Sequence, residues 1–182
     1  TCPKIRSFHK KNEIQYAGYN AMNKLTGRKT IIGHKKEDKG QYDIPLYTHG
    51  AYSGAMMIRK SVIEQTGMLP RNFFIYFDDS DVSARILKNG YKILYQPKAV
   101  VYNRASLLPS EKSAINVYYR TRNRILFMRR NSNLLQFSIF LSFFFFLTIP
   151  ATTTKFLIKR QFTHLQSFFK GIWWNVKMRA AA

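Results

Sequence analysis

The chain has 182 residues and a formal net charge of +21, because 30 Lys and Arg face only 9 Asp and Glu. A hydrophobic fraction of 46% excludes an intrinsically disordered chain, and the single cysteine, Cys2, excludes an internal disulfide and a cysteine-based metal site. The positive charge indicates an anionic partner, which is a nucleic acid, an anionic membrane surface or a phosphorylated substrate.

The first 49 residues are polar, basic and rich in turn residues, a composition that predicts short strands separated by loops. Residues 30–32 form one such extended piece, and residues 33–42 are predicted to be a surface loop. The run of small and apolar residues at 51–58 then predicts a buried strand.

A short helix is expected next, because Ser61 and Glu64 match a capping box and Gly67 supplies a C-terminal stop. The aromatic run 73–77 predicts a further strand.

The following predicted helix begins at the acidic run 78–81 and ends at the Asn-Gly pair 89–90. Residues 91–95 and 99–102 are predicted to form two strands around Pro97. Because helices and strands alternate, the sequence predicts an α/β layer arrangement.

A longer helix is predicted from a cap at Ser110 to about Arg130. Beyond it, residues 134–149 are the most apolar segment, with 16 residues or about 24 Å of helix. That length is short of a hydrocarbon core of about 30 Å.

Basic residues flank the apolar segment on both sides, and a single span would place one basic cluster on the far side of the membrane. We therefore expect residues 134–154 to be interfacial or re-entrant at the cytoplasmic face of the cell membrane, peripheral or shallowly inserted. Trp173 and Trp174, among basic residues, suit a head-group anchor. The alternative interpretation is a buried core helix.

The acidic run holds Asp78, Asp79 and Asp81, three of only nine acidic residues. One interpretation is helix capping, because free backbone N–H groups and the helix dipole stabilise an aspartate in the first turn. The other interpretation is catalysis, because catalytic carboxylates often occupy strand-to-helix corners.

Several short motifs follow one another in order along the chain. They are Gly54-Ala55-Met56-Met57-Ile58-Arg59, Gly67-Met68-Leu69, Phe73-Phe74-Ile75-Tyr76-Phe77-Asp78-Asp79-Ser80-Asp81, Arg85, Gly90-Tyr91 and Ile93-Leu94-Tyr95-Gln96-Pro97, with Asp38-Lys39-Gly40-Gln41-Tyr42 upstream and Tyr119, Arg122-Asn123-Arg124 and Phe127 downstream. This ordered series resembles the second half of family 2 glycosyltransferases of the rhamnosyltransferase-like kind, over roughly residues 3–130.

The resemblance implies an incomplete GT-A fold, with residues 1–130 as the C-terminal, acceptor-side portion of the catalytic domain and residues 131–182 as a helical membrane-associated tail. It further implies an inverting transferase that moves a sugar from a nucleotide-sugar donor to a glycan or lipid-linked acceptor in cell-surface polysaccharide synthesis.

In such enzymes the second carboxylate of a Glu-Asp pair deprotonates the acceptor hydroxyl, and this role falls on Asp79. Asp78 replaces the Glu and is expected to support the base. Tyr76 and Phe77 would give the acceptor pocket an apolar wall, and Gly54 is expected to line the same pocket.

The leaving nucleoside diphosphate needs cationic partners, and the resemblance implies that Arg122 and Arg124 supply them. Because these arginines are two residues apart, a straight helix cannot aim both at one phosphate. The alternative is a solvated or lipid-facing basic helix. Many relatives have a His where this chain has Asn103, which offers only a carbonyl oxygen as a ligand.

A divalent cation, Mg²⁺ or Mn²⁺, is expected in the complete enzyme. The family's Asp-x-Asp metal motif has no counterpart here, because Asp79-Ser80-Asp81 matches the later motif, in which Asp81 caps or orients the helix. We therefore expect no metal ligands in this chain, a missing donor-binding half and an inactive isolated polypeptide.

Two alternatives remain at this stage. A nucleic-acid-binding protein is suggested by charge alone, but no zinc spacing or interleaved stacking aromatics supports it, so we expect no nucleic-acid partner. A non-catalytic, basic, membrane-bound scaffold is the second alternative.

Overall fold

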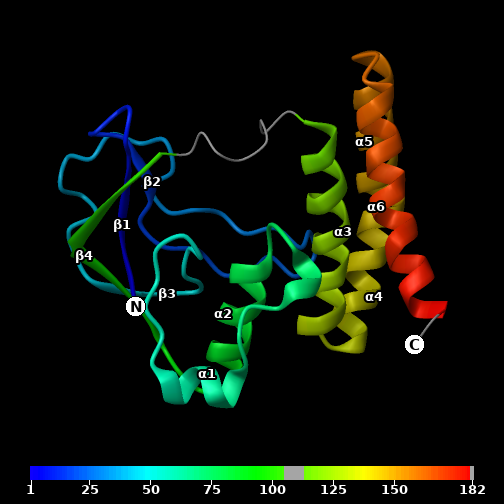
Figure 1. Ribbon diagram of the computed structural model, residues 1–182. Coiled ribbons are helices and arrows are strands. Elements are labelled where there is room, and N and C mark those ends of the chain that lie inside the picture. The colour runs from blue at the N-terminus through cyan, green and yellow to red at the C-terminus, as the bar shows by residue number, and fades with distance from the viewer. Residues whose placement is uncertain (105–112, 181–182) are drawn as a thin grey trace. The chain divides into compact units, whose positions relative to one another are not determined.

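The structure is a computed structural model that describes residues 1–104 and 113–180, and the chain forms two compact units (Figure 1). Unit 1 consists of residues 1–22, 29–74 and 78–104, and unit 2 consists of residues 23–28, 75–77 and 113–180. Strands and helices occur together, so the protein is mixed α/β, as the alternation of elements predicts.

Unit 1 is built on a four-stranded sheet with the strand order β2-β1-β4-β3. The strands are β1 (Cys2–Ser7), β2 (Ile14–Tyr16), β3 (Leu46–Thr48) and β4 (Ile93–Asn103). The central strands β1 and β4 are parallel, and each outer strand pairs antiparallel with its neighbour.

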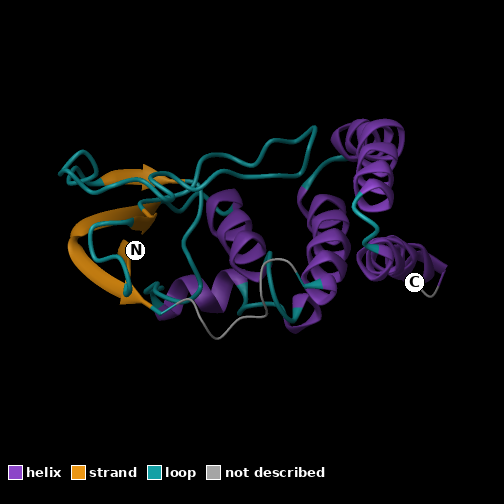
Figure 2. Cartoon of the chain, turned by 90° about the horizontal axis from the view of Figure 1, so that it is seen from above, coloured by secondary structure: helices purple, strands orange, loops and turns teal. Residues whose placement is uncertain are grey.

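Strand β4 is one long, curved strand and not the two strands predicted around Pro97 (Figure 2). Its pairing with β1 jumps between Pro3 and Lys4, from Gln96 to Val100. Because proline has no N–H to donate to a ladder, the residues around Pro97 form the irregularity, and the strand continues beyond it.

Two α-helices, α1 (Lys60–Thr66) and α2 (Asp78–Lys88), complete unit 1. Gly67 and Gly90 follow them at positive φ, which confirms the two predicted stops. The buried core lies between these helices and the sheet. Its members include Ile5, Ile14, Tyr16, Val62, Val82, Ile86, Ile93 and Tyr95.

Three further local predictions are wrong. Residues 51–58 form a loop with a turn, and the aromatic run 73–77 begins in the 3-10 helix η1 (Arg71–Phe73) and continues without strand pairing. The capping box is also absent, because α1 begins one residue before Ser61 and its N-cap is Arg59, which makes no side-chain cap bond. Apolar content alone did not distinguish loops from strands in the first two of these runs.

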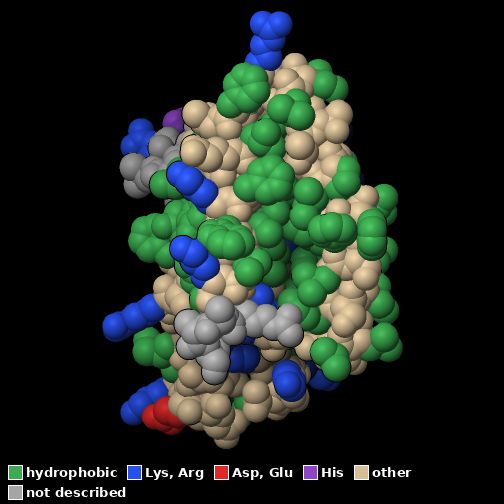
Figure 3. Space-filling view, turned by 90° about the vertical axis from the view of Figure 1, so that its right-hand side faces the viewer, with side chains coloured by type: hydrophobic (Ala, Val, Ile, Leu, Met, Phe, Trp, Pro, Cys, Tyr) green, Lys and Arg blue, Asp and Glu red, His purple; other side chains and the backbone are tan. Residues whose placement is uncertain are grey.

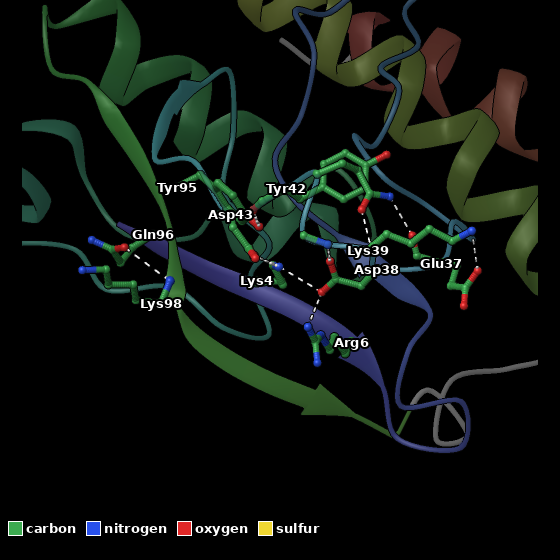
Figure 4. A network of polar contacts seen from close by, with 12 residues as sticks. Lys4, Arg6, Glu37, Asp38, Lys39, Tyr42, Asp43, Tyr95, Gln96 and Lys98 are labelled. Carbon is green, nitrogen blue, oxygen red and sulfur yellow. Dashed lines mark hydrogen bonds and ion pairs between the residues drawn. The ribbon is translucent and has the colours of Figure 1, made fainter.

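The loop at 33–43 is held against β1 by a cluster of buried charges (Figure 4). The ammonium of Lys4 donates to Asp38 at 2.9 Å and also contacts Asp43, and Arg6 forms an ion pair with Asp38. The side chains of Lys4 and Asp38 are each 1% exposed. Burial acts to raise the pKa of Asp38, but the bonds from Lys4 and Arg6 outweigh it and lower the pKa overall.

We expect Asp38→Asn to destabilise unit 1 by about 3 kcal/mol, because it leaves Lys4 buried without its best partner. Since the folded-state pKa of Asp38 is depressed, its contribution is present above the unfolded pKa of about 3.9 and is lost as the pH falls through the folded value. Denaturant unfolding from pH 7 to pH 2 measures this. Glu37→Gln, at an exposed ion pair with Lys39, is the matched control and is expected to change stability by less than about 1 kcal/mol. Equal stabilities of the two variants at pH 7 would contradict the role of the cluster.

Unit 2 is helical in its described part. Its elements are α3 (Ala114–Asn131), α4 (Leu134–Phe143), the π-helical turn η3 (Phe144–Thr148), α5 (Ile149–Ile158) and α6 (Phe162–Ala180). The hydroxyl of Ser113 caps α3 by accepting from the backbone N–H of Asn116. The predicted cap at Ser110 lies outside the described residues.

Helices α3 and α6 pack closely at Gly171. A Cβ placed there would lie 2.8 Å from the carbonyl oxygen of Tyr118, so only glycine permits this separation. One turn further, the buried amide of Asn175 donates to the carbonyl oxygens of Arg122 and Gly171. The contact therefore fixes which face of α3 meets α6.

Helices α4 and α5 are joined through η3 into one continuous 25-residue helix, Leu134–Ile158, which is long and apolar enough to cross a membrane by length and composition. Only 17% of its most apolar stretch is buried within the protein. Phe146, for example, is 70% exposed. Figure 3 shows a broad field of hydrophobic side chains on this side of unit 2. The segment is thus longer than the predicted 134–149 and is not a buried core helix.

Candidate functional site

The acidic run opens α2, and its three aspartates have different surroundings. Asp81 is buried and accepts from Nε of Arg85 at 3.0 Å, one helical turn away. Arg85 in turn donates to the carbonyl oxygens of Thr66, Gly67 and Met68 at the end of α1. Asp81 therefore orients the guanidinium that caps α1, which is a structural role.

Asp79 is 8% exposed and accepts from three donors that come from different parts of unit 1. Ser80 donates to Oδ1 at 2.9 Å, and the ammonium of Lys29 lies 3.4 Å from the same oxygen. The phenol of Tyr19 donates to Oδ2 at 3.3 Å. A carboxylate has about four lone-pair positions, so these contacts fix its orientation and leave one position on Oδ2 for a further donor.

Tyr19 and Lys29 also contact each other. The Lys29 ammonium lies 3.3 Å from the centre of the Tyr19 ring, which is a cation–π contact. Burial lowers the pKa of Lys29, while the charge of Asp79 acts in the opposite direction. Burial and then the charge of Asp79 raise the pKa of Tyr19, so the phenol remains a hydrogen-bond donor at neutral pH.

The position of Tyr19 is set by β3. The hydroxyl of Thr48 accepts from the backbone N–H of Tyr19 at 2.6 Å and donates to its carbonyl oxygen at 3.0 Å. The ring also packs edge-to-face on Tyr16, with centroids 5.0 Å apart. A strand end thus places the phenol that meets Asp79.

Asp78 is partly exposed and differs from Asp79 in its electrostatics. Burial and then the neighbouring charge of Asp79 raise the pKa of Asp78, although hydrogen bonds from backbone N–H groups at 78 and 79 act the other way. Two carboxylates therefore meet at one helix start, and the charge of Asp79 disfavours ionisation of Asp78.

The residues before the pair have an unusual backbone. Phe74, Tyr76 and Phe77 have φ of 61°, 64° and 66°, a region that bulky residues rarely adopt and that costs about 1–3 kcal/mol each. Such strain concentrates at functional sites. Here it turns the chain abruptly into α2, so that Asp78 and Asp79 occupy the first turn.

Tyr76 and Phe77, predicted to line the acceptor pocket, anchor their segment within unit 2. The Tyr76 hydroxyl donates to Asn116 at 2.8 Å, and the Phe77 ring packs on Phe127 with centroids 5.7 Å apart. Asn123 donates to the backbone carbonyl oxygens of Ile75 and Tyr76. The third predicted pocket residue, Gly54, lies in an exposed turn of unit 1.

The two arginines predicted to contact a diphosphate do not converge. The guanidinium of Arg122 lies 4.4 Å from the Trp174 ring of α6, whereas that of Arg124 lies 5.2 Å from the Phe144 ring of η3. Asn103 belongs to unit 1 and donates to the side chain of Gln15 at 3.0 Å. The two arginines thus face different helices.

A divalent cation does not fit the acidic run. Within residues 1–104 and 113–180, no group of three or more His, Cys, Asp and Glu could hold a metal ion. Asp79 and Asp81 are each engaged by a basic side chain instead.

The partners Tyr19 and Lys29 cannot be recognised from the sequence. They lie 60 and 50 residues before Asp79, outside the motif series, and no spacing connects them to it. Only the fold brings the three side chains together.

Comparison with known proteins identifies no family for the chain. No protein-family model matches the chain, and no curated protein matches it. Fold and site define a mixed α/β protein with a buried, oriented aspartate and an appended apolar helical unit.

We expect Asp78→Asn to raise the stability of unit 1 at pH 7, because it removes a carboxylate whose ionisation is disfavoured in the folded state. The folded-state pKa of Asp78 is raised, so ionisation destabilises the protein above that value, and the cost disappears as the pH falls below the unfolded pKa of about 3.9. The difference from wild type should therefore shrink between pH 7 and pH 3, as measured by thermal unfolding. Glu64→Gln, at an exposed pair on α1, is the control and should show no such gain. Destabilisation by Asp78→Asn at pH 7 would contradict this account of the pair.

Proposed function

We propose that unit 1 is the acceptor-side part of a GT-A domain and that the protein acts in inverting glycosyl transfer from a nucleotide-sugar donor to a glycan or lipid-linked acceptor. One observation carries the proposal. The residue on which the motif series places the catalytic base, Asp79, is a buried carboxylate oriented by Lys29, Tyr19 and Ser80. An oriented carboxylate with one accepting position left is what a general base requires.

In the proposed reaction, the acceptor hydroxyl donates its hydrogen bond to Oδ2 of Asp79. As its oxygen attacks the anomeric carbon from the face opposite the nucleotide, the proton moves to Asp79. The bond between the anomeric carbon and the diphosphate oxygen breaks, and the nucleoside diphosphate leaves with that electron pair. Lys29 offsets the negative charge before the transfer and is a positioning residue.

Asp78 is proposed to support the base through its charge. The roles of Tyr76, Phe77 and Gly54 in acceptor binding stay predictions, as do those of Asn103, Arg122 and Arg124 at the donor diphosphate. The expected Mg²⁺ or Mn²⁺ has no ligand group among the described residues, so no step here depends on it.

The exposed apolar surface of Leu134–Ile158 supports a membrane location for the site. We propose that unit 2 holds the protein at the cytoplasmic face of the cell membrane, where an acceptor with a lipid anchor is at high local concentration.

The non-catalytic scaffold remains the competing function, since the same three contacts to Asp79 also serve a purely structural ion pair. The scaffold and the transferase differ in what an isosteric change at Asp79 does. A structural ion pair requires the charge for folding, whereas a base requires it for turnover.

We expect Asp79→Asn to lower sugar transfer at least about a hundredfold, because an amide cannot accept the proton. The measurement uses the polypeptide as its own gene encodes it, in cell membranes, with a panel of labelled nucleotide sugars, and donor binding should stay within about twofold.

Asp81→Asn is the matched control on the same helix turn. Breaking the ion pair between buried Asp81 and half-buried Arg85 should cost about 3 kcal/mol of stability yet leave turnover per folded molecule close to wild type. Wild-type turnover by Asp79→Asn would remove Asp79 as the base and favour the scaffold.

A further inference from the structure

Unit 2 contains a cavity of about 280 Å³ beside the apolar helix. Its lining residues are Thr26, Arg28, Arg124, Phe143, Leu147, Thr148, Ala151 and Thr152. Thr26, Arg28 and Arg124 make one part of the lining cationic and hydroxyl-bearing. The part that comes from the helix Leu134–Ile158 combines apolar side chains with the hydroxyls of Thr148 and Thr152. The volume is at the lower limit of small-molecule pockets, which run from about 300 Å³ upward, so the cavity suits a head group better than a whole nucleotide sugar.

Arg124 lines this cavity although the residue is only 8% exposed. Its Nε donates to the carbonyl oxygen of Thr26 at 2.6 Å, and the guanidinium lies near the Phe140 and Phe144 rings. Among the described residues, no carboxylate forms an ion pair with it. A buried cation without an anionic partner is costly and points to a function.

A second cation faces the same cavity. Arg28 is exposed, lines the cavity and likewise forms no ion pair with a carboxylate of residues 1–104 or 113–180. Burial, and then the charge of Arg28, lower the pKa of Arg124 to about 10. The two like charges are thus close enough to repel each other, and a bound anion would relieve both the repulsion and the desolvation.

The backbone holds both arginines in place. Gly27 lies between Thr26 and Arg28 at φ +60°, and a Cβ there would lie 2.9 Å from Met128 and 3.0 Å from Phe140. The turn at 23–28 therefore packs tightly on α3 and α4 only because residue 27 is glycine. The packing of Gly27 thus fixes the backbone from which Arg28 extends, and the bond from Arg124 to Thr26 ties Arg124 to the same turn.

The rest of the lining comes from a helix irregularity. Phe143, Leu147 and Thr148 lie at or in the π-helical turn η3, shortly before Pro150, whose missing N–H disrupts the α-helical bonding pattern. Such π turns occur frequently at functional sites. Here the turn lies within the 25-residue helix that is apolar enough to cross a membrane.

We propose that this cavity binds the phosphate group of a membrane lipid, with Arg28 and Arg124 on the phosphate oxygens, the threonine hydroxyls around them and the chain of the lipid along the exposed apolar helix. Arginine pairs phosphate bidentately, which matches a site with two guanidinium groups. The apolar side chains of the lining favour a lipid over free phosphate. The inference rests on unit 2 alone, goes beyond the proposed sugar transfer, and assigns Arg124 to the lipid phosphate in place of the donor diphosphate that the sequence predicts for it.

The test measures vesicle binding by the full chain, without any nucleotide sugar. One set of vesicles contains nine parts phosphatidylcholine and one part phosphatidic acid. The other replaces the phosphatidic acid by enough cholesteryl hemisuccinate, a carboxylate lipid, to give the same surface potential. Since a chain of charge +21 binds any anionic surface, the ratio of the two affinities is the informative quantity.

We expect wild type to prefer the phosphatidic acid vesicles about tenfold, as charge-assisted bonds to phosphate imply. Arg28→Gln and Arg124→Met should each bring the ratio close to one. Arg160→Gln, an equally exposed arginine on unit 2 outside the cavity, should weaken binding to both vesicles and keep the ratio. Thermal unfolding shows whether Arg124→Met is folded. If that variant is unfolded, Arg28→Gln, at an exposed position, still tests the proposal.

Equal affinities of wild type for the two vesicles, or loss of the ratio in Arg160→Gln, would overturn the proposal in favour of general surface charge. Inorganic phosphate is tested alone by thermal shift, and binding as tight as that of phosphatidic acid would overturn the assignment to a lipid. Because no sugar is transferred in these assays, their failure leaves the proposed role of Asp79 untouched.

Discussion

The pairing of each buried aspartate with a basic side chain is the constraint on which unit 1 depends. With nine acids in a chain of charge +21, cations are abundant and anions are scarce. The three buried aspartates each fix one piece of the unit. The pairs are Asp38 with Lys4 and Arg6, Asp79 with Lys29, and Asp81 with Arg85.

These pairs are not equivalent, and their differences assign their roles. Asp38 and Asp81 are linked to guanidinium groups, and they hold a loop against β1 and the end of α1. Asp79 instead meets an ammonium and a phenol and lies beside a second carboxylate, Asp78, whose pKa is raised first by burial and then by Asp79. Two neighbouring acids whose pKa values are pushed apart by their surroundings recur in acid–base catalysis.

In the described part of unit 2, by contrast, two arginines are not balanced by acidic side chains. The turn at 23–28 and helix α3 place two arginines, Arg28 and Arg124, at one cavity, and no carboxylate of the described residues forms an ion pair with either. In unit 1 the protein supplies its own anions, whereas in unit 2 the anion is proposed to come from a lipid. The excess positive charge is therefore treated differently in the two units. In unit 1 basic side chains pair with buried aspartates, and in unit 2 two arginines are proposed to pair with a bound phosphate.

How much the sequence predicts depends on the range of the interactions. The helix at 78–88 and its glycine stop were predicted correctly, because the acidic first turn, Val82 and Ile86 at helical spacing and Gly90 are local signals. The strand predicted at 73–77 is wrong, because aromatic content resembles a strand while three positive φ values forbid one. Backbone strain of this kind has no composition signature.

At the candidate site, the sequence predicts the aspartates but not their partners. Asp79 was found through the motif series. Lys29 and Tyr19 lie 50 and 60 residues before it, and Thr48 of β3 fixes the chain around Tyr19. The cavity of unit 2 was likewise beyond prediction, because Arg28 and Arg124 are 96 positions apart in sequence and meet only through the turn at Gly27. Long-range contacts set both sites.

The central claim is that this protein takes part in inverting glycosyl transfer. The most direct test incubates the full-length gene product, with any residues that flank residues 1–182, in its membranes with a panel of nucleotide sugars. The glycans and lipids are then examined by mass spectrometry and NMR. The account predicts a product heavier by one sugar residue, with the anomeric configuration opposite to that of the donor. A product of retained configuration, or no sugar-bearing product with any donor, would contradict it.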